Sequence, residues 1–222
     1  MGLIRELINN PNHKGGIERC YYQCEMSKAG QYWMAITEQY IDKPKKEPNI
    51  KDAWNNTILW ALGNPKCKID LLKGIGLVGR TGSGKTITMH ILNDFIKIDE
   101  IKYKRGKDMV NLKFKMESAL VIASEYAQQG DVIIQKYSNF ANLCIDDLGA
   151  ENSEKSYFGN KVNVIQEIIE NRYNNGLMIH FTSNLNMDLI QKTYGDRVYS
   201  RLYDACNVLT LNDCDFRLLK NK

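Results

Sequence analysis

Residues 79–86, with the sequence GRTGSGKT, constrain the fold of this chain more than any other segment. An apolar run over residues 75–78 precedes them and predicts a short buried strand, and apolar residues at helical spacing follow from Ile87 to Leu92. Glycines let successive backbone N–H groups face an anion, and the N-terminal end of the following helix adds a positive dipole. The order of strand, glycine-rich loop and helix predicts a site for the phosphates of a nucleotide.

Every residue of this loop is a candidate phosphate contact. The set is Gly79, Arg80, Thr81, Gly82, Ser83, Gly84, Lys85 and Thr86. The Lys85 side chain is expected to reach the β- and γ-phosphates, and the Thr86 hydroxyl is a candidate ligand for Mg²⁺. The chain is therefore expected to bind a nucleoside triphosphate with Mg²⁺.

A second apolar strand, predicted over residues 142–146, ends in two adjacent carboxylates, Asp146 and Asp147. In open α/β proteins the ligand lies at the carboxyl ends of parallel strands, so these side chains are expected beside the phosphate loop. We assign Asp146 to the water shell of the metal and Asp147 to polarising the attacking water.

A third apolar strand is predicted over residues 177–181 and is followed by Thr182, Ser183 and Asn184. A polar side chain at the end of a strand between the other two can hydrogen-bond the γ-phosphate or the water. We select Asn184 for this role. His180 lies within the strand, where a histidine of the core is more common than a ligand.

The remaining pattern alternates helices with short strands. Helical spacing predicts helices over residues 52–62, 87–98, 118–128, 131–137 and 162–173, although residues 120–122 also suit a strand. Alternation predicts a strand over residues 110–116. Near the N-terminus, residues 4–8 predict a short amphipathic helix, and residues 42–48, with two prolines, predict a linker.

Composition indicates an ordinary globular protein without a membrane span. The 222 residues are 43% hydrophobic and 25% charged, and no apolar run approaches the roughly 18 residues of a spanning helix. The first residues lack the apolar core of a signal peptide, so a cytoplasmic location is expected. Scattered cysteines favour free thiols, and a zinc site at Cys20, Cys24 and His13 is disfavoured because no second ligand pair follows.

The net charge of +4 is concentrated in one segment. Residues 97–115 contain seven basic and three acidic side chains, so the excess of positive charge in this segment equals that of the whole chain. Such a segment can contact the phosphates of single-stranded DNA, but a basic surface loop is more often only solvated.

Taken together, four sequence blocks resemble the AAA+ ATPases, specifically the bacterial helicase loaders of the DnaC and DnaI type and the IstB-like transposition helpers. The blocks are GRTGSGKT at 79–86, LCIDDLGAE at 143–151, HFTSNL at 180–185, and GDRVYSRLYDA at 195–205 followed by DFR at 215–217. The resemblance covers residues 50–220. It implies that the nucleotide is ATP and that the activity is Mg²⁺-dependent ATP hydrolysis.

The resemblance also implies roles for three residues. Asn184 corresponds to sensor 1, Arg201 to the arginine finger, and Arg217 to a sensor 2 arginine. The planar charged fork of arginine suits neutralisation of charge on the γ-phosphate, whereas surface ion pairing is the ordinary role for these residues and for Arg197. Many AAA+ proteins have Asp-Glu where this chain has Asp146-Asp147, so Glu151 is a second candidate for polarising the water.

The fold implied is α/β: a three-layer P-loop NTPase sandwich with a mainly parallel five-stranded sheet. A small helical N-terminal extension over residues 1–48 would precede an ATPase domain over residues 49–222. No C-terminal lid domain is expected, because five residues follow Arg217.

The expected function is that of a DnaC-like helicase loader in DNA replication. The protein would assemble as a homo-oligomer with Arg201 acting in trans, and its protein partner would be a replicative helicase or a transposase. The alternatives are an IstB-like transposition helper or a nucleotide-gated adaptor with weak hydrolysis. A small-molecule kinase is disfavoured, because the sequence indicates neither an acceptor pocket nor a closing lid.

Overall fold

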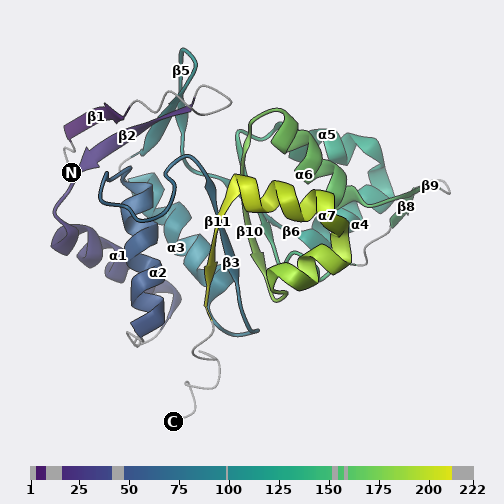
Figure 1. Cartoon of the computed structure of the whole chain (residues 1–222), viewed down its shortest axis with the longest axis horizontal. Helices are drawn as coiled ribbons and strands as arrows, with labels where there is room; N and C mark the ends of the chain where they lie inside the picture. The colour runs from purple at the N-terminus through teal and green to yellow at the C-terminus, as the bar shows by residue number, and fades with distance from the viewer. Residues whose placement is uncertain are drawn as a thin grey trace, which may run out of the picture. The chain divides into compact units, whose positions relative to one another are not determined.

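The computed structural model describes residues 4–8, 17–41, 48–98, 100–151, 155–157 and 160–211 (Figure 1). These residues form two compact units. One unit contains the described residues up to Leu72, together with Thr86–Lys113 and Leu211. The other contains Lys73–Lys85 and Phe114–Thr210, and it holds most of the candidate site.

The second unit is built on a five-stranded sheet. Its strands are β3 (Gly74–Val78), β6 (Lys115–Ser118), β7 (Asn142–Asp146), β10 (Met178–Ser183) and β11 (Cys206–Thr210). They lie in the order β11-β3-β10-β7-β6, and every pairing is parallel. β3 and β10 are buried along their whole length, as expected of inner strands of a parallel sheet, and neither alternates between apolar and exposed polar residues. The predicted α/β class and parallel five-stranded sheet are confirmed.

The described part of this unit contains four helices; three of them contact the sheet, and the fourth, the second in chain order, packs against its two neighbours in sequence (Figure 1). They are α4 (Ala119–Gln129), α5 (Asp131–Asn139), α6 (Val164–Asn174) and α7 (Met187–Ala205). The Ser118 hydroxyl accepts a hydrogen bond from the Leu120 amide, so residues 120–122, which also suited a strand, begin a capped helix. A separate hairpin is formed by β8 (Lys155–Tyr157) and β9 (Asn160–Val162).

A buried arginine joins several of these elements. Arg172 is fully buried on α6, and its guanidinium donates to the carbonyls of Tyr137, Phe140 and Met178 at 3.0, 2.6 and 2.6 Å. Longer bonds reach Ser138 and Ala141. One side chain therefore satisfies carbonyls at the end of α5, in the turn before β7 and at the start of β10.

The first unit contains a four-stranded antiparallel sheet in the order β1-β2-β4-β5. The strands are β1 (Ile4–Ile8), β2 (Ile17–Gln23), β4 (Lys102–Arg105) and β5 (Asp108–Asn111), and the helices are α1 (Met26–Tyr40), α2 (Pro48–Ala61) and α3 (Lys85–Ile98). The prediction of a helix over residues 4–8 is wrong: the segment is β1, because it pairs with β2. The predicted linker over residues 42–48 lies outside the described residues, apart from Pro48.

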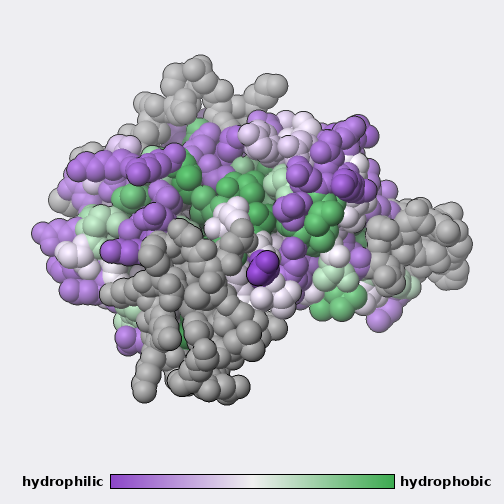
Figure 2. Space-filling model, turned by 60° about the horizontal axis from the view of Figure 1, so that its bottom comes forward, coloured by the Kyte–Doolittle hydropathy of each residue, from purple (hydrophilic) through white to green (hydrophobic). Residues whose placement is uncertain are grey.

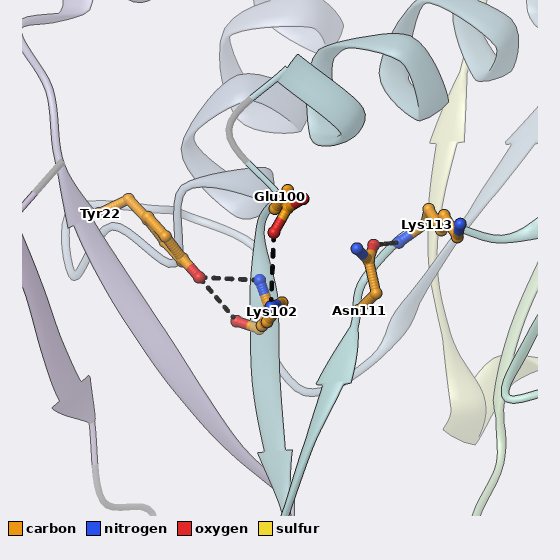
Figure 3. A network of polar contacts seen from close by, with 5 residues as sticks. All are labelled: Tyr22, Glu100, Lys102, Asn111 and Lys113. Atoms are coloured by element: carbon orange, nitrogen blue, oxygen red, sulfur yellow. Dashed lines mark hydrogen bonds and ion pairs between the residues drawn. The ribbon is translucent and has the colours of Figure 1, made fainter. Parts of the chain in front are cut away.

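The strand predicted over residues 110–116 is two strands in different sheets. β5 ends at Asn111, whose side chain accepts a hydrogen bond from the Lys113 amide at 2.9 Å, and β6 begins at Lys115. Figure 3 shows this turn beside β4, where the Tyr22 hydroxyl accepts a hydrogen bond from the Lys102 amide at 2.8 Å. The alternation of apolar residues continued across the break, so it gave no sign of the change of sheet.

The cysteines of the described residues carry free thiols, and Cys20, Cys144 and Cys206 are buried. Within the described ranges, no three histidine, cysteine, aspartate or glutamate residues are grouped to hold a metal; His13 lies outside those ranges. None of the described helices has the length and apolar character needed to span a membrane. Among the coloured residues of Figure 2, hydrophilic areas flank a hydrophobic one.

Candidate functional site

The phosphate loop leaves the buried strand β3 and enters α3. Gly79, Gly82 and Gly84 have φ angles of 152°, 83° and 85°, a region that glycine adopts without steric cost. The Gly79 amide donates to the carbonyl of Ser183 at the end of β10, at 3.2 Å. The backbone angles of the loop therefore require glycine at these three positions. The hydrogen bond of the Gly79 amide fixes the start of the loop to β10.

Lys85, the first residue of α3, is directed back over the loop. Lys85 is only 4% exposed, and its Nζ donates hydrogen bonds to the carbonyls of Gly79 at 2.9 Å and Arg80 at 2.8 Å. A third bond of 2.8 Å reaches Oδ1 of Asn184. The structure thus brings together two residues that were predicted separately, the lysine of the phosphate loop and the polar residue after β10.

The loop also contains a buried hydroxyl group, that of Ser83, for which the described residues provide no hydrogen-bond partner. A buried donor without a partner is costly, and a phosphate oxygen has the acceptor chemistry to satisfy it. Arg80 and Thr81 are exposed on the outer part of the loop, and Thr86 follows Lys85 in the first turn of α3. The residues present therefore fit a bound phosphate group.

One threonine organises the two acidic residues after β7. The Thr182 hydroxyl donates to Oδ1 of Asp146 at 2.6 Å and accepts a hydrogen bond from the Asp147 amide at 2.9 Å. Thr182 is fully buried at the end of β10, whereas both aspartates are partly exposed. Asp146 is thus oriented by a neighbouring strand, as a carboxylate that is to hold a metal must be. Thr182 was not predicted as a site residue, because a threonine at the end of an apolar run is typical of any strand.

The backbone turns sharply directly after Asp146. Asp147 has a φ angle of 52°, which is uncommon for a residue other than glycine, and its carbonyl accepts from the Ala150 amide at 2.9 Å. The Leu148 amide donates to the carbonyl of Thr182 at 2.8 Å. The Leu148 carbonyl accepts a hydrogen bond from the Ser183 hydroxyl at 2.6 Å. The turn that carries Asp147 is therefore tied to β10 on both sides of Leu148.

Glu151 lies in a different environment from the one needed to polarise water. It is only 8% exposed, and its Oε2 accepts a hydrogen bond from the Gly149 amide at 3.0 Å. Its Oε1 accepts from the Tyr194 hydroxyl on α7. Burial and the neighbouring Glu151 carboxylate raise the pKa of Tyr194 above its ordinary value. Both carboxylate oxygens are engaged inside the protein, so these contacts do not support Glu151 as the water-polarising residue.

His180 is part of the core. It is fully buried on β10, and its Nδ1 accepts a hydrogen bond from the Ile75 amide at 3.1 Å. The ring also packs against Phe114, with 4.7 Å between the ring centroids. The interpretation of His180 as a core histidine agrees with these contacts.

Arg201 lies on α7 and is held within its own unit. Its Nη1 forms an ion pair of 2.8 Å with Oε2 of Glu170 on α6, and its guanidinium lies 5.5 Å from the ring centroid of Tyr173. Arg197 pairs with the same carboxylate at 3.5 Å but is much more exposed. The contacts described for Arg201 do not connect it with the Lys85 and Asp146 group. Arg217 lies outside the described residues.

The basic run of residues 97–115 is not a loop but mainly the hairpin of β4 and β5. Four of its lysines form ion pairs with carboxylates: Lys97 with Asp94, Lys102 with Glu100, Lys104 with Glu18, and Lys115 with Glu117. Figure 3 shows Glu100 beside Lys102. Intramolecular pairs offset part of the local positive charge that a nucleic acid would meet.

No protein-family model and no curated protein matches the chain. Solved structures do match. The DnaC helicase loader superposes with a TM-score of 0.53 at 20% identity, covering 82% of this chain and 98% of that one. DnaI superposes with a TM-score of 0.54 at 21% identity, covering 79% and 88%. The replication initiator DnaA, bound to AMPPCP and single-stranded DNA, superposes with a TM-score of 0.52 at 17% identity, covering 76% and 48%.

These similarities establish the fold. The parallel sheet, the phosphate loop after β3 and the polar ends of β7 and β10 occur here in an α/β fold that the chain shares with DnaC, DnaI and DnaA. The resemblance expected from the four sequence blocks is confirmed at this level.

Proposed function

We propose that this chain, which has the AAA+ fold of the DnaC-type helicase loaders, is a Mg²⁺-dependent ATPase that loads or remodels a protein partner during DNA replication. Residues 49–222 are proposed to carry the activity. The observation that carries the proposal is the convergence of Lys85, Asn184 and the Asp146–Asp147 turn at the carboxyl ends of three adjacent parallel strands. Ligands bind at this edge of open α/β sheets.

Each residue has a role that follows from its chemistry. The loop amides of residues 79–84 and the Lys85 ammonium would hold the phosphates, and Thr86 and Asp146 would hold Mg²⁺. The metal would neutralise charge on the β- and γ-phosphates. Asp147, at the start of the turn, would polarise the attacking water, and Asn184 would orient that water or the γ-phosphate.

Arg201 is proposed to complete the site of a neighbouring copy of the chain. An arginine finger contributes roughly 10³ to 10⁵ in rate, so a subunit without a neighbour should turn over ATP slowly. The Glu170 carboxylate lies 2.8 Å from the guanidinium and would have to share or release it when the neighbour binds. Arg217 is proposed as a further arginine of the same site, on the resemblance alone.

The partner follows from the structural relatives rather than from a described surface. One relative is a helicase loader and another holds single-stranded DNA, so a replicative helicase and single-stranded DNA are the proposed partners. Residues 97–115 are the proposed DNA contact. Because four of their lysines are already paired, we expect that contact to be weak and sensitive to salt.

The test is ATP binding and turnover by the full chain. Calorimetric titration should show that wild type binds ATP with Mg²⁺ and that Lys85→Ala does not, while Lys28→Ala, an exposed lysine on α1, binds as wild type does. Turnover per subunit should rise with protein concentration and fall again in Arg201→Ala. A rate per subunit independent of concentration would contradict assembly in trans, and equal rates with and without single-stranded DNA would remove residues 97–115 from the proposal.

One observation favours a second function, a nucleotide-gated adaptor. Asp147 is one methylene shorter than glutamate, so its reach toward a water is shorter. In an adaptor, bound ATP would order a surface for the partner and hydrolysis would contribute little. Asp147→Asn distinguishes the two functions: partner loading that survives this change favours the adaptor, and its loss favours the ATPase.

A further inference from the structure

A hydrogen bond between two buried side chains connects the turn after β7 with helix α7. The Tyr194 hydroxyl donates to Oε1 of Glu151, and Oε2 of the same carboxylate accepts from the Gly149 amide at 3.0 Å. Glu151 and Tyr194 are 8% and 5% exposed, so water has little access to either. A carboxylate at such a depth is tolerated only when hydrogen bonds replace its hydration. The pair is therefore a specific link between two segments that are distant in sequence.

The turn at one end of this link belongs to the candidate site. Gly149 lies two residues after Asp147, within the turn closed by the bond from the Ala150 amide to the Asp147 carbonyl. Gly149 has a φ of 94°, and a Cβ added there would lie 2.5 Å from Cδ1 of Leu185. Asp147 and Gly149 belong to the same short turn, so a shift of Asp147 is expected to move the Gly149 amide and the carboxylate bonded to it.

The other end of the link is the break in α7. Tyr194 directly precedes Gly195, whose φ and ψ of 82° and 171° are not helical and divide the helix in two. This conformation belongs almost exclusively to glycine. Hinges are formed by a few residues that absorb a large change of backbone angle. Gly195 suits such a role, because it has no Cβ and already departs from helical angles. Tyr194 thus holds the first half of α7 at the residue beside the hinge.

The second half of α7 carries the arginine that acts on a neighbouring copy in the proposed function. Arg201 and Arg197 both follow the hinge, and both pair with Glu170 on α6. The side-chain amide Nε2 of Gln191 donates to Oδ1 of Asp196 across the break at 2.7 Å, so the two halves remain in contact. A rotation at Gly195 would change the position of Arg201 relative to Glu170.

We propose that Glu151 and Tyr194 are positioning residues that transmit the state of the nucleotide at the Asp147 turn to the Arg201 half of α7. The inference rests on the proposed function, because it requires that the site bind a nucleotide. It assigns to Glu151 a role in regulation, and not in polarising water. It also gives a physical reason for a buried tyrosine hydroxyl at a position where phenylalanine would fill the same space.

The experiment is hydrogen exchange on the full chain, with and without AMPPCP and Mg²⁺. In wild type, bound nucleotide should change the exchange rates of amides in residues 196–205 by about 5-fold or more. Tyr194→Phe should bind AMPPCP within about 2-fold of wild type, since the hydroxyl does not contact the phosphate loop. In this variant the change in residues 196–205 should shrink to less than about 2-fold.

A matched control separates coupling from stability. Tyr137 is another fully buried tyrosine of the same unit, and its hydroxyl donates to Glu125 at 3.1 Å on helices α5 and α4. Tyr137→Phe should lower the thermal midpoint to a similar extent and leave the nucleotide response of residues 196–205 intact. If Tyr194→Phe does not fold, Glu151→Gln is tested in its place. The glutamine side chain has one acceptor oxygen, so it cannot accept from both the Tyr194 hydroxyl and the Gly149 amide as the two carboxylate oxygens do.

The outcomes distinguish the two proposals. If wild type does not bind AMPPCP, the proposed function fails and the inference fails with it. If wild type binds and residues 196–205 do not respond, only the inference is overturned. An unchanged response in Tyr194→Phe or Glu151→Gln would likewise overturn it, as would loss of the response in Tyr137→Phe.

Discussion

The ammonium group of Lys85 donates a 2.8 Å hydrogen bond to the Asn184 side chain, which joins the phosphate loop to the end of the adjacent strand β10. The same ammonium bonds the carbonyls of Gly79 and Arg80. An ammonium has three N–H donors and no acceptor, so a phosphate oxygen would compete with these carbonyl and amide oxygens for the same donors. Asn184 is therefore in position to respond when Lys85 engages a nucleotide.

Asn184→Ala should separate binding from turnover. Lys85 and the loop amides remain, so the affinity for ATP should stay within about 3-fold of wild type, whereas the turnover rate should fall by about 100-fold, as when one positioned polar group is removed from an active site. Asn139→Ala, an exposed asparagine at the end of α5, is the control and should change neither quantity. An equal loss of affinity and rate would show that Asn184 only supports Lys85.

Thr182→Val should weaken the use of Mg²⁺ more than it weakens the fold. Valine keeps the shape but removes the donor to Asp146 and the acceptor for the Asp147 amide. Loss of a residue that orients a metal ligand costs about 10- to 100-fold, so the Mg²⁺ concentration for half-maximal turnover should rise by that factor. Thr182→Ser keeps the hydroxyl and should restore the wild-type Mg²⁺ dependence.

The control for this change is Thr57→Val. Thr57 is a buried threonine of α2 whose hydroxyl donates to the Ala53 carbonyl at 2.8 Å, away from the acidic residues in sequence. Its loss of stability should resemble that of Thr182→Val, with the Mg²⁺ dependence unchanged. A Mg²⁺ profile of Thr182→Val that matched wild type would assign Thr182 to folding alone.

Arg172→Met should be one of the most destabilising single changes in the second unit. Methionine fills much of the volume but leaves the carbonyls of Tyr137, Phe140 and Met178 without their donors. We expect a loss of about 3 kcal/mol in the free energy of unfolding, measured by urea titration, from several buried acceptors. Arg197→Met, on a side chain that is 69% exposed, should change the same quantity by no more than about 0.5 kcal/mol.

Local patterns were sufficient to predict three strands of the parallel sheet and the phosphate loop. Buried parallel strands are continuous apolar runs, and a glycine-rich loop has few other uses between a strand and a helix, so β3, β7 and β10 were found from short windows. Asn184 was selected because it follows a strand of the same sheet, and its position beside Lys85 agrees with the rule that parallel strands bring their carboxyl ends to one edge.

What was missed depends on pairing between distant segments. Residues 4–8 form β1 only because β2 lies alongside, and their apolar spacing alone also fits a helix. The bond of Glu151 to Tyr194 joins residues 43 positions apart, and Thr182 acts through the register of β10 against β7. A threonine or glutamate carries no local mark of such a role, so a single sequence does not reveal it.

The break in α7 leads to a prediction about two glycines. A Cβ at Gly195 would meet no atom within 4 Å, yet its φ of 82° is one that alanine adopts only at a cost, so Gly195→Ala should lower the free energy of unfolding by about 1 to 3 kcal/mol. Gly30 also has free space around its Cβ position but lies within helix α1. Gly30→Ala should therefore raise stability by about 0.5 to 1 kcal/mol. If urea titrations show that Gly195→Ala lowers the free energy of unfolding and Gly30→Ala raises it, the backbone angle at each glycine determines the effect of the added Cβ.

The ion pair of Glu170 with Arg201 should make stability depend on pH in a defined window. Partial burial alone would raise the pKa of Glu170, but the hydrogen bond and charge of Arg201 outweigh it and hold the pKa below the ordinary 4.5. A carboxyl with a lowered pKa in the folded state contributes its full stability above the unfolded pKa, and it loses this contribution as the pH falls through the folded value.

Glu170→Gln removes this contribution at all pH values. At pH 7 the variant should unfold at lower urea concentration than wild type, by about 1 kcal/mol, because the pair is only partly buried and solvent screens it. The difference between the two proteins should shrink as the pH falls below 4.5 and vanish once the wild-type carboxyl is protonated. Glu38→Gln, an exposed carboxyl on α1, should show no comparable difference at pH 7. A gap between wild type and Glu170→Gln that stayed constant down to pH 3 would mean that the Glu170 carboxylate charge does not contribute, and that packing of its side chain does.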